Sequence, residues 1–121
     1  MRARYWLAAA FVVATAILAP GFAGGALSDC NPGRMCLWGN NDFKWKIADR
    51  AAGSGTIVNL TGDANNEMDS WANRSGSYTG CGYGAANGTG DRQEWGPNSN
   101  DNNVAPWNSD EVSSWRTRYG C

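Results

Sequence analysis

The sequence contains no histidine among its 121 residues. Histidine is the side chain that most often acts as a general base near neutral pH, so the usual hydrolytic sites are missing. The glycine-rich stretch GAANGTG at 84–90 lacks the lysine of a phosphate-binding loop. These absences predict that the protein is not an enzyme. A pair of carboxylates acting on a glycoside is the remaining catalytic alternative.

Basic charge is scarce as well. Once the two arginines at positions 2 and 4 are set aside, eight basic residues stand against eleven acidic ones. Nucleic-acid binding requires a basic surface that neutralises phosphates. The balance of charge therefore predicts no nucleic-acid partner.

The chain has one long apolar run, at residues 5–18. It is shorter than the roughly 20 residues that a membrane-spanning helix needs, although a membrane anchor is the alternative interpretation. Two arginines precede the run and small residues follow it, so residues 1–26 are predicted to be a signal peptide cleaved after Ala23 or Ala26. Cleavage would release a secreted, extracellular domain, residues 27–121, that has no membrane attachment and that we expect to be a monomer.

Helical periodicity is also missing, because no segment keeps a 3.6-residue apolar period over three turns. Short strand-like pieces bounded by turn residues are present instead. They are RMCLWG at 34–39, TIVNL at 56–60, SWANRSGSYT at 70–79, CGYG at 81–84 and SWRTRYG at 114–120. We interpret the polar stretch at 96–110 as loop. Many short strands with glycine-rich turns predict an all-β sandwich or small barrel.

The four cysteines are Cys30, Cys36, Cys81 and Cys121. An even number of cysteines in a small secreted domain indicates disulfides. The Pro-Gly turn in CNPGRMC favours a Cys30–Cys36 bond, which leaves Cys81 to pair with Cys121.

One phrase is written twice in the chain. NNEMDSW ends at Trp71 and SDEVSSW ends at Trp115, and the starts CLWG and CGYG match at an offset of 45. The match predicts two repeated units, at about 30–78 and 79–121, that pack on each other because neither could bury its own apolar face. We expect both tryptophans to lie in the shared core.

The repeated unit resembles the βγ-crystallin Greek key motif: an aromatic, four spacers, a second aromatic, one spacer and a glycine. The first copy has Trp38 and Phe43 but Trp45 in place of glycine. The second has Tyr83, a glycine in place of the second aromatic, and Gly90. The resemblance implies a double Greek key β-sandwich.

The doubled phrase also resembles the calcium signature of that motif: two Asn/Asp, two variable residues, Ser/Thr, then Ser. The first copy departs from it at its fifth residue and the second at its first. The resemblance implies side-chain ligands from the second and fifth positions and backbone carbonyls from the third. The implied calcium ligands are Asn66, Glu67, Asp69, Asp110, Glu111 and Ser113. The alternative is that these residues serve only turns and solvent.

The opening CNPGRMCLWGNNDF is similar to that of secreted bacterial peptidase inhibitors of the Streptomyces metalloproteinase inhibitor type. That resemblance implies reversible inhibition of an extracellular peptidase through a rigid loop. Two segments are candidates for this loop, 38–46 and 94–107, and we favour the second because tryptophans flank it. No residue identifies a reactive bond, so the inhibitory residues stay unassigned.

Tryptophan is abundant, with seven residues in the chain. Of these, Trp38, Trp45, Trp95 and Trp107 are expected to be partly exposed, since polar residues surround them. Exposed aromatics can bind a protein or a sugar ring. The alternatives to an inhibitor are therefore a calcium-binding or stress-related crystallin module, and a cell-wall or glycan-binding protein.

Overall fold

The computed structural model describes residues 26–105 and 108–121. The expected signal peptide lies outside the described residues, apart from its last residue, Ala26. Within the described ranges, no helix is long and apolar enough to cross a bilayer.

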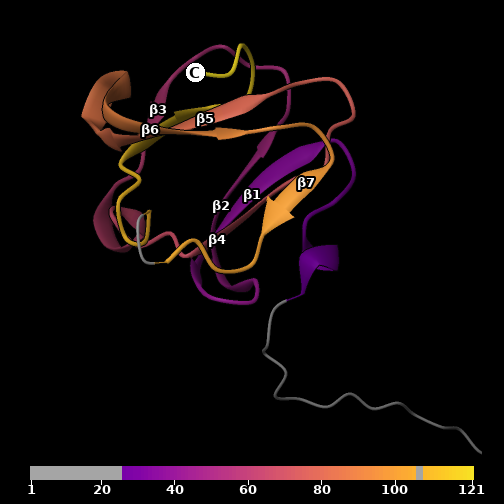
Figure 1. Ribbon diagram of the computed structural model, residues 1–121, viewed down its shortest axis with the longest axis horizontal. Helices are drawn as coiled ribbons and strands as arrows, with labels where there is room; N and C mark the ends of the chain where they lie inside the picture. Colours follow the sequence, from indigo (N-terminus) through magenta and orange to yellow (C-terminus); the bar gives the residue numbers. More distant parts are fainter. Residues whose placement is uncertain (1–25, 106–107) are drawn as a thin grey trace, which may run out of the picture.

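The described chain folds into eight strands and three short 3-10 turns (Figure 1). The strands are β1 (Arg34–Asn40), β2 (Lys44–Ala51), β3 (Val58–Asn59), β4 (Ser70–Asn73), β5 (Gly80–Ala85), β6 (Thr89–Trp95), β7 (Ser99–Asp101) and β8 (Ser114–Arg116). The 3-10 turns are η1 (Leu27–Asp29), η2 (Gly62–Ala64) and η3 (Ala86–Gly88). The predicted all-β fold is confirmed.

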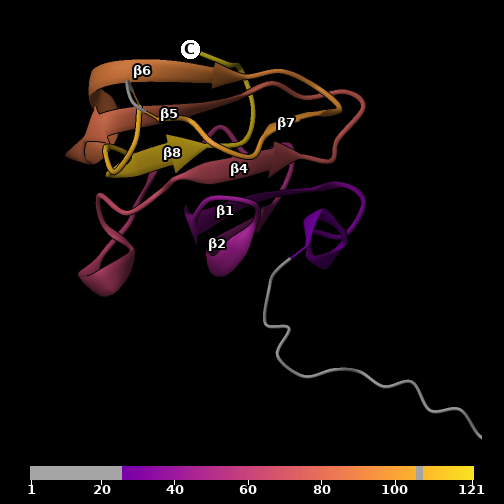
Figure 2. The same ribbon diagram turned by 60° about the horizontal axis from the view of Figure 1, so that its bottom comes forward.

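Two four-stranded antiparallel sheets form the layers that Figure 2 shows one above the other. Their strand orders are β2-β1-β4-β7 and β3-β8-β5-β6. Of the first four strands, β1, β2 and β4 lie in the first sheet and β3 lies in the second. Of the last four, β5, β6 and β8 lie in the second sheet and β7 lies in the first. This exchange of one strand makes a sandwich of two interlocked Greek keys.

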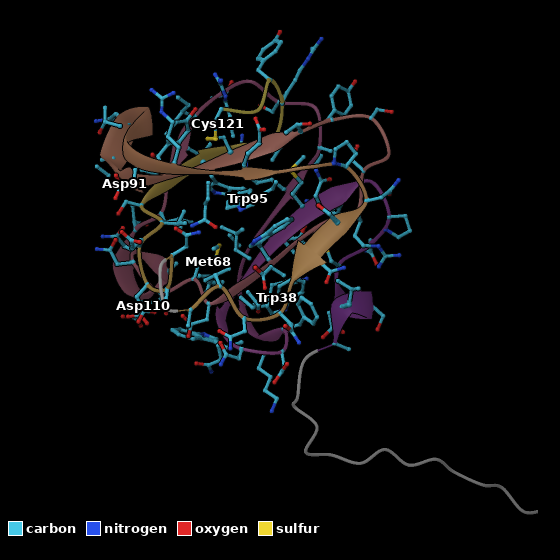
Figure 3. The ribbon with its side chains drawn as sticks, in the orientation of Figure 1. Trp38, Met68, Asp91, Trp95, Asp110 and Cys121 are labelled. Atoms are coloured by element: carbon cyan, nitrogen blue, oxygen red, sulfur yellow. A yellow bond between two sulfur atoms is a disulfide. The ribbon has the colours of Figure 1, made fainter. Side chains whose placement is uncertain are left out.

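The core lies between the sheets, with Trp95 near its centre (Figure 3). Its indole stacks on Trp71 at 5.6 Å and meets Trp115 edge to face at 6.1 Å. Trp115 is fully buried as expected, whereas Trp71 is half-buried and packs against the core from its rim. Met68 and Val112, which occupy the same position in the two phrases, are both buried.

Arg50 ties the two sheets together from the edge strand β2. Its guanidinium donates to the carbonyls of Trp115 and Thr56, both at 2.9 Å, and to the hydroxyl of Ser54 at 3.3 Å. It also lies over the Trp115 ring, 4.9 Å from the centroid. Burial lowers the pKa of Arg50, but an arginine remains charged at neutral pH.

Both disulfides have the expected pairing. Cys30 is bonded to Cys36 and Cys81 to Cys121. The first closes the turn that leads into β1, and the second fastens the end of the chain to β5. They attach the two chain ends of the domain to its sheets.

The extent of several strands differs from the sequence prediction. TIVNL forms only a two-residue strand, because Val58 and Asn59 are exposed at the edge of their sheet. Segment 44–51 was not predicted as a strand, and its exposed, charged face explains why. The strand β7 lies inside the stretch interpreted as loop, where three polar residues pair with β4 through backbone bonds alone. Polar edge strands lack the apolar alternation that identifies a strand in a sequence.

Candidate functional site

The doubled phrase forms a reciprocal backbone pair in space. The N–H of Asn66 donates to the carbonyl of Val112, and the N–H of Asp110 donates to that of Met68, both at 3.0 Å. Asn66 and Asp110 have nearly the same left-handed backbone, with φ of 61° and 58°. The two copies are therefore hydrogen-bonded to each other in the same way in both directions. Each copy uses the same backbone geometry, which fits the repeat in the sequence.

Side-chain oxygens meet at both ends of this pair. The hydroxyl of Ser113 donates to Oδ1 of Asn66 at 2.8 Å. At the other end, the hydroxyl of Ser109 makes a short hydrogen bond to Asp69, whose carboxylate lies near Asp110. Burial, and then the neighbouring negative charge of Asp69 and Glu67, raises the pKa of Asp110. The second end is thus an acidic site in which two carboxylates repel each other.

Four of the six residues implied as calcium ligands are therefore brought together in two sets. One set joins Asn66 to Ser113, and the other joins Asp69 to Asp110. The backbone carbonyls of Glu67 and Glu111 accept no hydrogen bond from any described residue. Within residues 26–105 and 108–121, no three carboxylate, cysteine or histidine side chains gather at one point. Any cation would hence need carbonyl, amide and hydroxyl oxygens in addition to one or two carboxylates, which is a set that suits calcium.

The serine that ends each phrase holds a hairpin turn. The hydroxyl of Ser70 donates to the carbonyl of Asn40 at 2.8 Å and accepts the N–H of Phe43 at 3.1 Å. In the second copy the hydroxyl of Ser114 donates to Ala85 at 2.7 Å and accepts from Gly88 at 2.9 Å. Both serines are fully buried. Each phrase thus fixes the β-hairpin of its own half.

The first candidate loop, 38–46, contains the turn between β1 and β2, and residues 40–46 form the tip of this hairpin. Asp42, Phe43 and Trp45 all have a left-handed backbone, with φ of 60°, 58° and 65°. For an L-residue this conformation costs about 1–2 kcal/mol. Trp45 keeps 46% of its surface exposed, and its ring lies against Gly39, where any Cβ would meet it at 2.1 Å.

Hydrogen bonds and one aromatic contact hold the tip of this hairpin in place. The N–H of Asp42 donates to the carbonyl of Asn102 at 2.8 Å, and the Asn102 amide donates back to Asp42 at 3.0 Å. The ammonium of Lys46 donates to the carbonyl of Asp29 and to the carboxylate of Asp49. Beneath the tip, the Phe43 ring packs edge to face on Trp38 with centroids 4.9 Å apart. The hairpin is therefore an exposed but well-anchored element.

The other candidate loop, 94–107, packs against the rest of the domain at several points. Trp95 is buried between the sheets, residues 99–101 form β7, and Val104 is buried with its N–H bonded to the carbonyl of Asp69 at 3.0 Å. Trp107 lies outside the described residues. Exposed residues of this segment lie around Pro97 and Asn98 before β7 and around Asn102 after it, and Asn102 is beside the tip of the first hairpin.

The expectation of partly exposed tryptophans is right for Trp45 and wrong for Trp38 and Trp95. The latter two are buried, because each side chain points from its strand toward a core cluster and not toward the polar loops nearby. The glycan-binding alternative rested on the number of exposed tryptophans. It loses that support, since Trp45 alone of these three is exposed.

Sequence analysis missed one exposed aromatic residue, Tyr119. Tyr119 is 67% exposed with φ of 76°, and its ring lies near the guanidinium groups of Arg116 and Arg118, at 5.8 and 4.7 Å from the centroid. Trp45, by contrast, is marked in the sequence, because it stands where the Greek key motif has glycine. Nothing in the sequence around Tyr119 marks it in the same way.

The two-sheet Greek key sandwich defines the protein as a βγ-crystallin fold, and solved structures agree. A structure described under "Evolution of the eye lens beta-gamma-crystallin domain fold" has a TM-score of 0.59 at 12% identity, covering 77% of this chain and 87% of that one. The calcium-bound βγ-crystallin domain of Abundant Perithecial Protein from Neurospora crassa has a TM-score of 0.55 at 19% identity, covering 72% of this chain and 89% of that one. A longer structure of the same fungal protein has a TM-score of 0.51 at 19% identity, covering 73% of this chain and 40% of that one.

The family model of peptidase inhibitor family I36 matches residues 23–90, which is more than half of the chain. The protein therefore belongs to this family, and its fold is that of a βγ-crystallin domain. No curated protein matches the sequence. The family and the fold both point to a non-catalytic protein.

Proposed function

We propose that the protein is a secreted inhibitor that binds an extracellular peptidase reversibly and occupies its active-site cleft. The match to the inhibitor family over residues 23–90 is the observation that carries the proposal. The two disulfides fit an oxidising compartment outside the cytosol, where secreted peptidases act. Release from the cell would use residues 1–26 as a signal peptide.

The scaffold suits this mode of inhibition because it is rigid close to its exposed turns. Binding costs less when the binding segment is already ordered in the free protein. Here the Cys30–Cys36 bond ties the segment before β1 to that strand, and the turn after β1 is fixed by the buried hydroxyl of Ser70. An exposed turn on such a base can enter a cleft with little loss of conformational entropy.

The test is an inhibition assay of the purified domain, residues 27–121, against a panel of secreted metallo- and serine peptidases. We expect dose-dependent inhibition of at least one of them, with full activity returning on dilution. The same protein with both disulfides reduced and alkylated is the control, and it should inhibit far more weakly. A folded domain that inhibits no member of the panel would contradict the proposal.

Calcium binding at the doubled phrase is a second candidate function, and the closeness of Asp69 and Asp110 favours it. Two carboxylates that repel each other gain stability when a divalent cation lies between them. Asn66, Ser113 and the carbonyls of Glu67 and Glu111 would supply neutral oxygens. Such an ion would bind next to two of the segments that cross between the sheets, from β3 to β4 and from β7 to β8, and would stabilise them. A thermal shift in millimolar calcium against chelator tests this candidate.

A further inference from the structure

We propose that the Trp45 indole is the anchor by which the hairpin 40–46 binds the peptidase, entering an apolar pocket of the cleft that accepts an aromatic side chain. This inference rests on the proposed function and names the surface that performs it. Sequence reasoning favoured the other candidate segment, whose main tryptophan is buried.

The argument begins with a comparison that the chain itself provides. The hairpins β1–β2 and β5–β6 are equivalent at an offset of 45, and the same three positions of each have a left-handed backbone. In the second hairpin they are Asn87, Gly88 and Gly90, with φ of 59°, 74° and 85°. In the first they are Asp42, Phe43 and Trp45. At the second and third of these positions, the second hairpin has glycine and the first hairpin has a large aromatic residue.

Glycine adopts this backbone without steric cost, and an aromatic residue does not. The ring of Phe43 has a structural reason to be there, because it packs on the buried Trp38. The ring of Trp45 has a weaker one. It covers Gly39, which has no side chain, and leaves 46% of its surface in solvent. The fold works in the second half with Gly84 and Gly90 at the positions that correspond to Gly39 and Trp45.

The surroundings of Trp45 are those of a binding element. The residues on either side of it, Lys44 and Lys46, are exposed, and Lys46 is already neutralised by Asp49 at 2.8 Å. Lys44 makes no ion pair with any residue that the structure describes, so a pocket with an acidic group near its rim would fit best. Tryptophan is the residue type that most often dominates the energy of a protein interface when it fills a pocket.

The test compares Trp45→Gly with Tyr119→Gly. Both changes replace an exposed aromatic at positive φ by glycine, and the C-terminal segment that carries Tyr119 lies at the opposite end of the molecule from Trp38 and its hairpin (Figure 3). We expect W45G to weaken inhibition of a responsive peptidase about 30-fold or more, as expected for a hot-spot residue, and Y119G to change it less than about threefold. W45F should keep most of the inhibition, since it retains an aromatic ring. W45G should show a cooperative thermal unfolding transition, which would establish that the variant is folded.

Each other outcome overturns the inference in a distinguishable way. If wild type inhibits and W45G inhibits equally well, the anchor is wrong while the proposed function stands. If W45G fails to fold, the ring is present for stability and not for binding. If wild type inhibits no peptidase at all, the proposed function fails and this inference fails with it.

Discussion

Ser70 and Ser114 make the same pair of hydrogen bonds in the two halves of the molecule. Each hydroxyl donates to a carbonyl at the end of the first strand of its hairpin and accepts an N–H from the turn that follows. These residues end the doubled phrase, and both are fully buried. The phrase is therefore repeated because two hairpins must be fixed in the same manner, and any ion site is built on that structural base.

Replacing either serine by alanine should destabilise the domain by about 1–3 kcal/mol, because a buried donor and acceptor lose their partner. We expect Ser70→Ala to weaken peptidase inhibition as well, since the turn it frees carries Trp45. Ser114→Ala should leave inhibition unchanged at temperatures where it is folded. Urea denaturation gives the free energies of unfolding, and equal inhibition by both variants would contradict the different roles of the two hairpins.

Asp110→Asn should stabilise the calcium-free protein at pH 7. The raised pKa means that the ionised carboxylate costs folding free energy, and this cost disappears as the pH falls through the folded pKa toward the unfolded value of about 3.8. The advantage of D110N over wild type should therefore shrink on acidification. Asp91→Asn, at an exposed acid of β6, is the control (Figure 3). Melting curves from pH 3 to 7 would contradict this account if D110N and D91N behaved alike.

The same variant tests calcium. Wild type should melt at a higher temperature in millimolar calcium than in chelator, because a ligand that binds only the folded state stabilises it. D110N should lose most of that shift. An identical melting temperature with and without calcium in the wild type would show that the doubled phrase serves the turns alone.

The two disulfides should differ in what they contribute. The Cys81–Cys121 bond closes 40 residues and Cys30–Cys36 closes 6. In the chain-entropy model, their contributions to the free energy of unfolding are about 4 and about 2 kcal/mol. Two variants, each with both cysteines of one disulfide replaced by alanine, can be compared by urea denaturation. A larger loss of unfolding free energy on removing Cys30–Cys36 than on removing Cys81–Cys121 would contradict the prediction.

Arg50→Lys should cost about 1–3 kcal/mol, because one ammonium cannot reach both the Trp115 and Thr56 carbonyls that the guanidinium serves. The matched control is Arg92→Lys, at an exposed arginine with a single contact of 3.5 Å to Cys121. Its effect should stay within about 0.5 kcal/mol. Equal losses in the two variants would show that Arg50 does not tie the sheets together.

The repeat made much of the fold predictable from the sequence. Matching Met68 with Val112 and Trp71 with Trp115 located core positions, and the Pro-Gly turn located one disulfide. Strand β2 was missed because its exposed face is charged and Trp45 interrupts its backbone. The burial of Trp38 and Trp95 was missed because neighbouring polar residues say nothing about which face of a strand points inward.

For the candidate site, the sequence identified the six oxygen-bearing residues but not their pairing across the two halves. That pairing depends on two reciprocal backbone bonds between residues 42 and 46 positions apart, Asp110 with Met68 and Asn66 with Val112. The sequence indicated Trp45 in two ways, as a departure from glycine in the motif and as a tryptophan expected to be partly exposed. Its left-handed backbone and its contact with Gly39 could be seen only in the folded structure.

The most direct test of the central claim is the activity of a responsive secreted peptidase, measured against inhibitor concentration at several substrate concentrations. A protein that fills the active-site cleft reversibly should give an apparent inhibition constant that rises linearly with substrate, and activity should return fully on dilution. An apparent constant that is independent of substrate would place the contact outside the cleft. No inhibition of any metallo- or serine peptidase by the folded, oxidised domain would contradict the account.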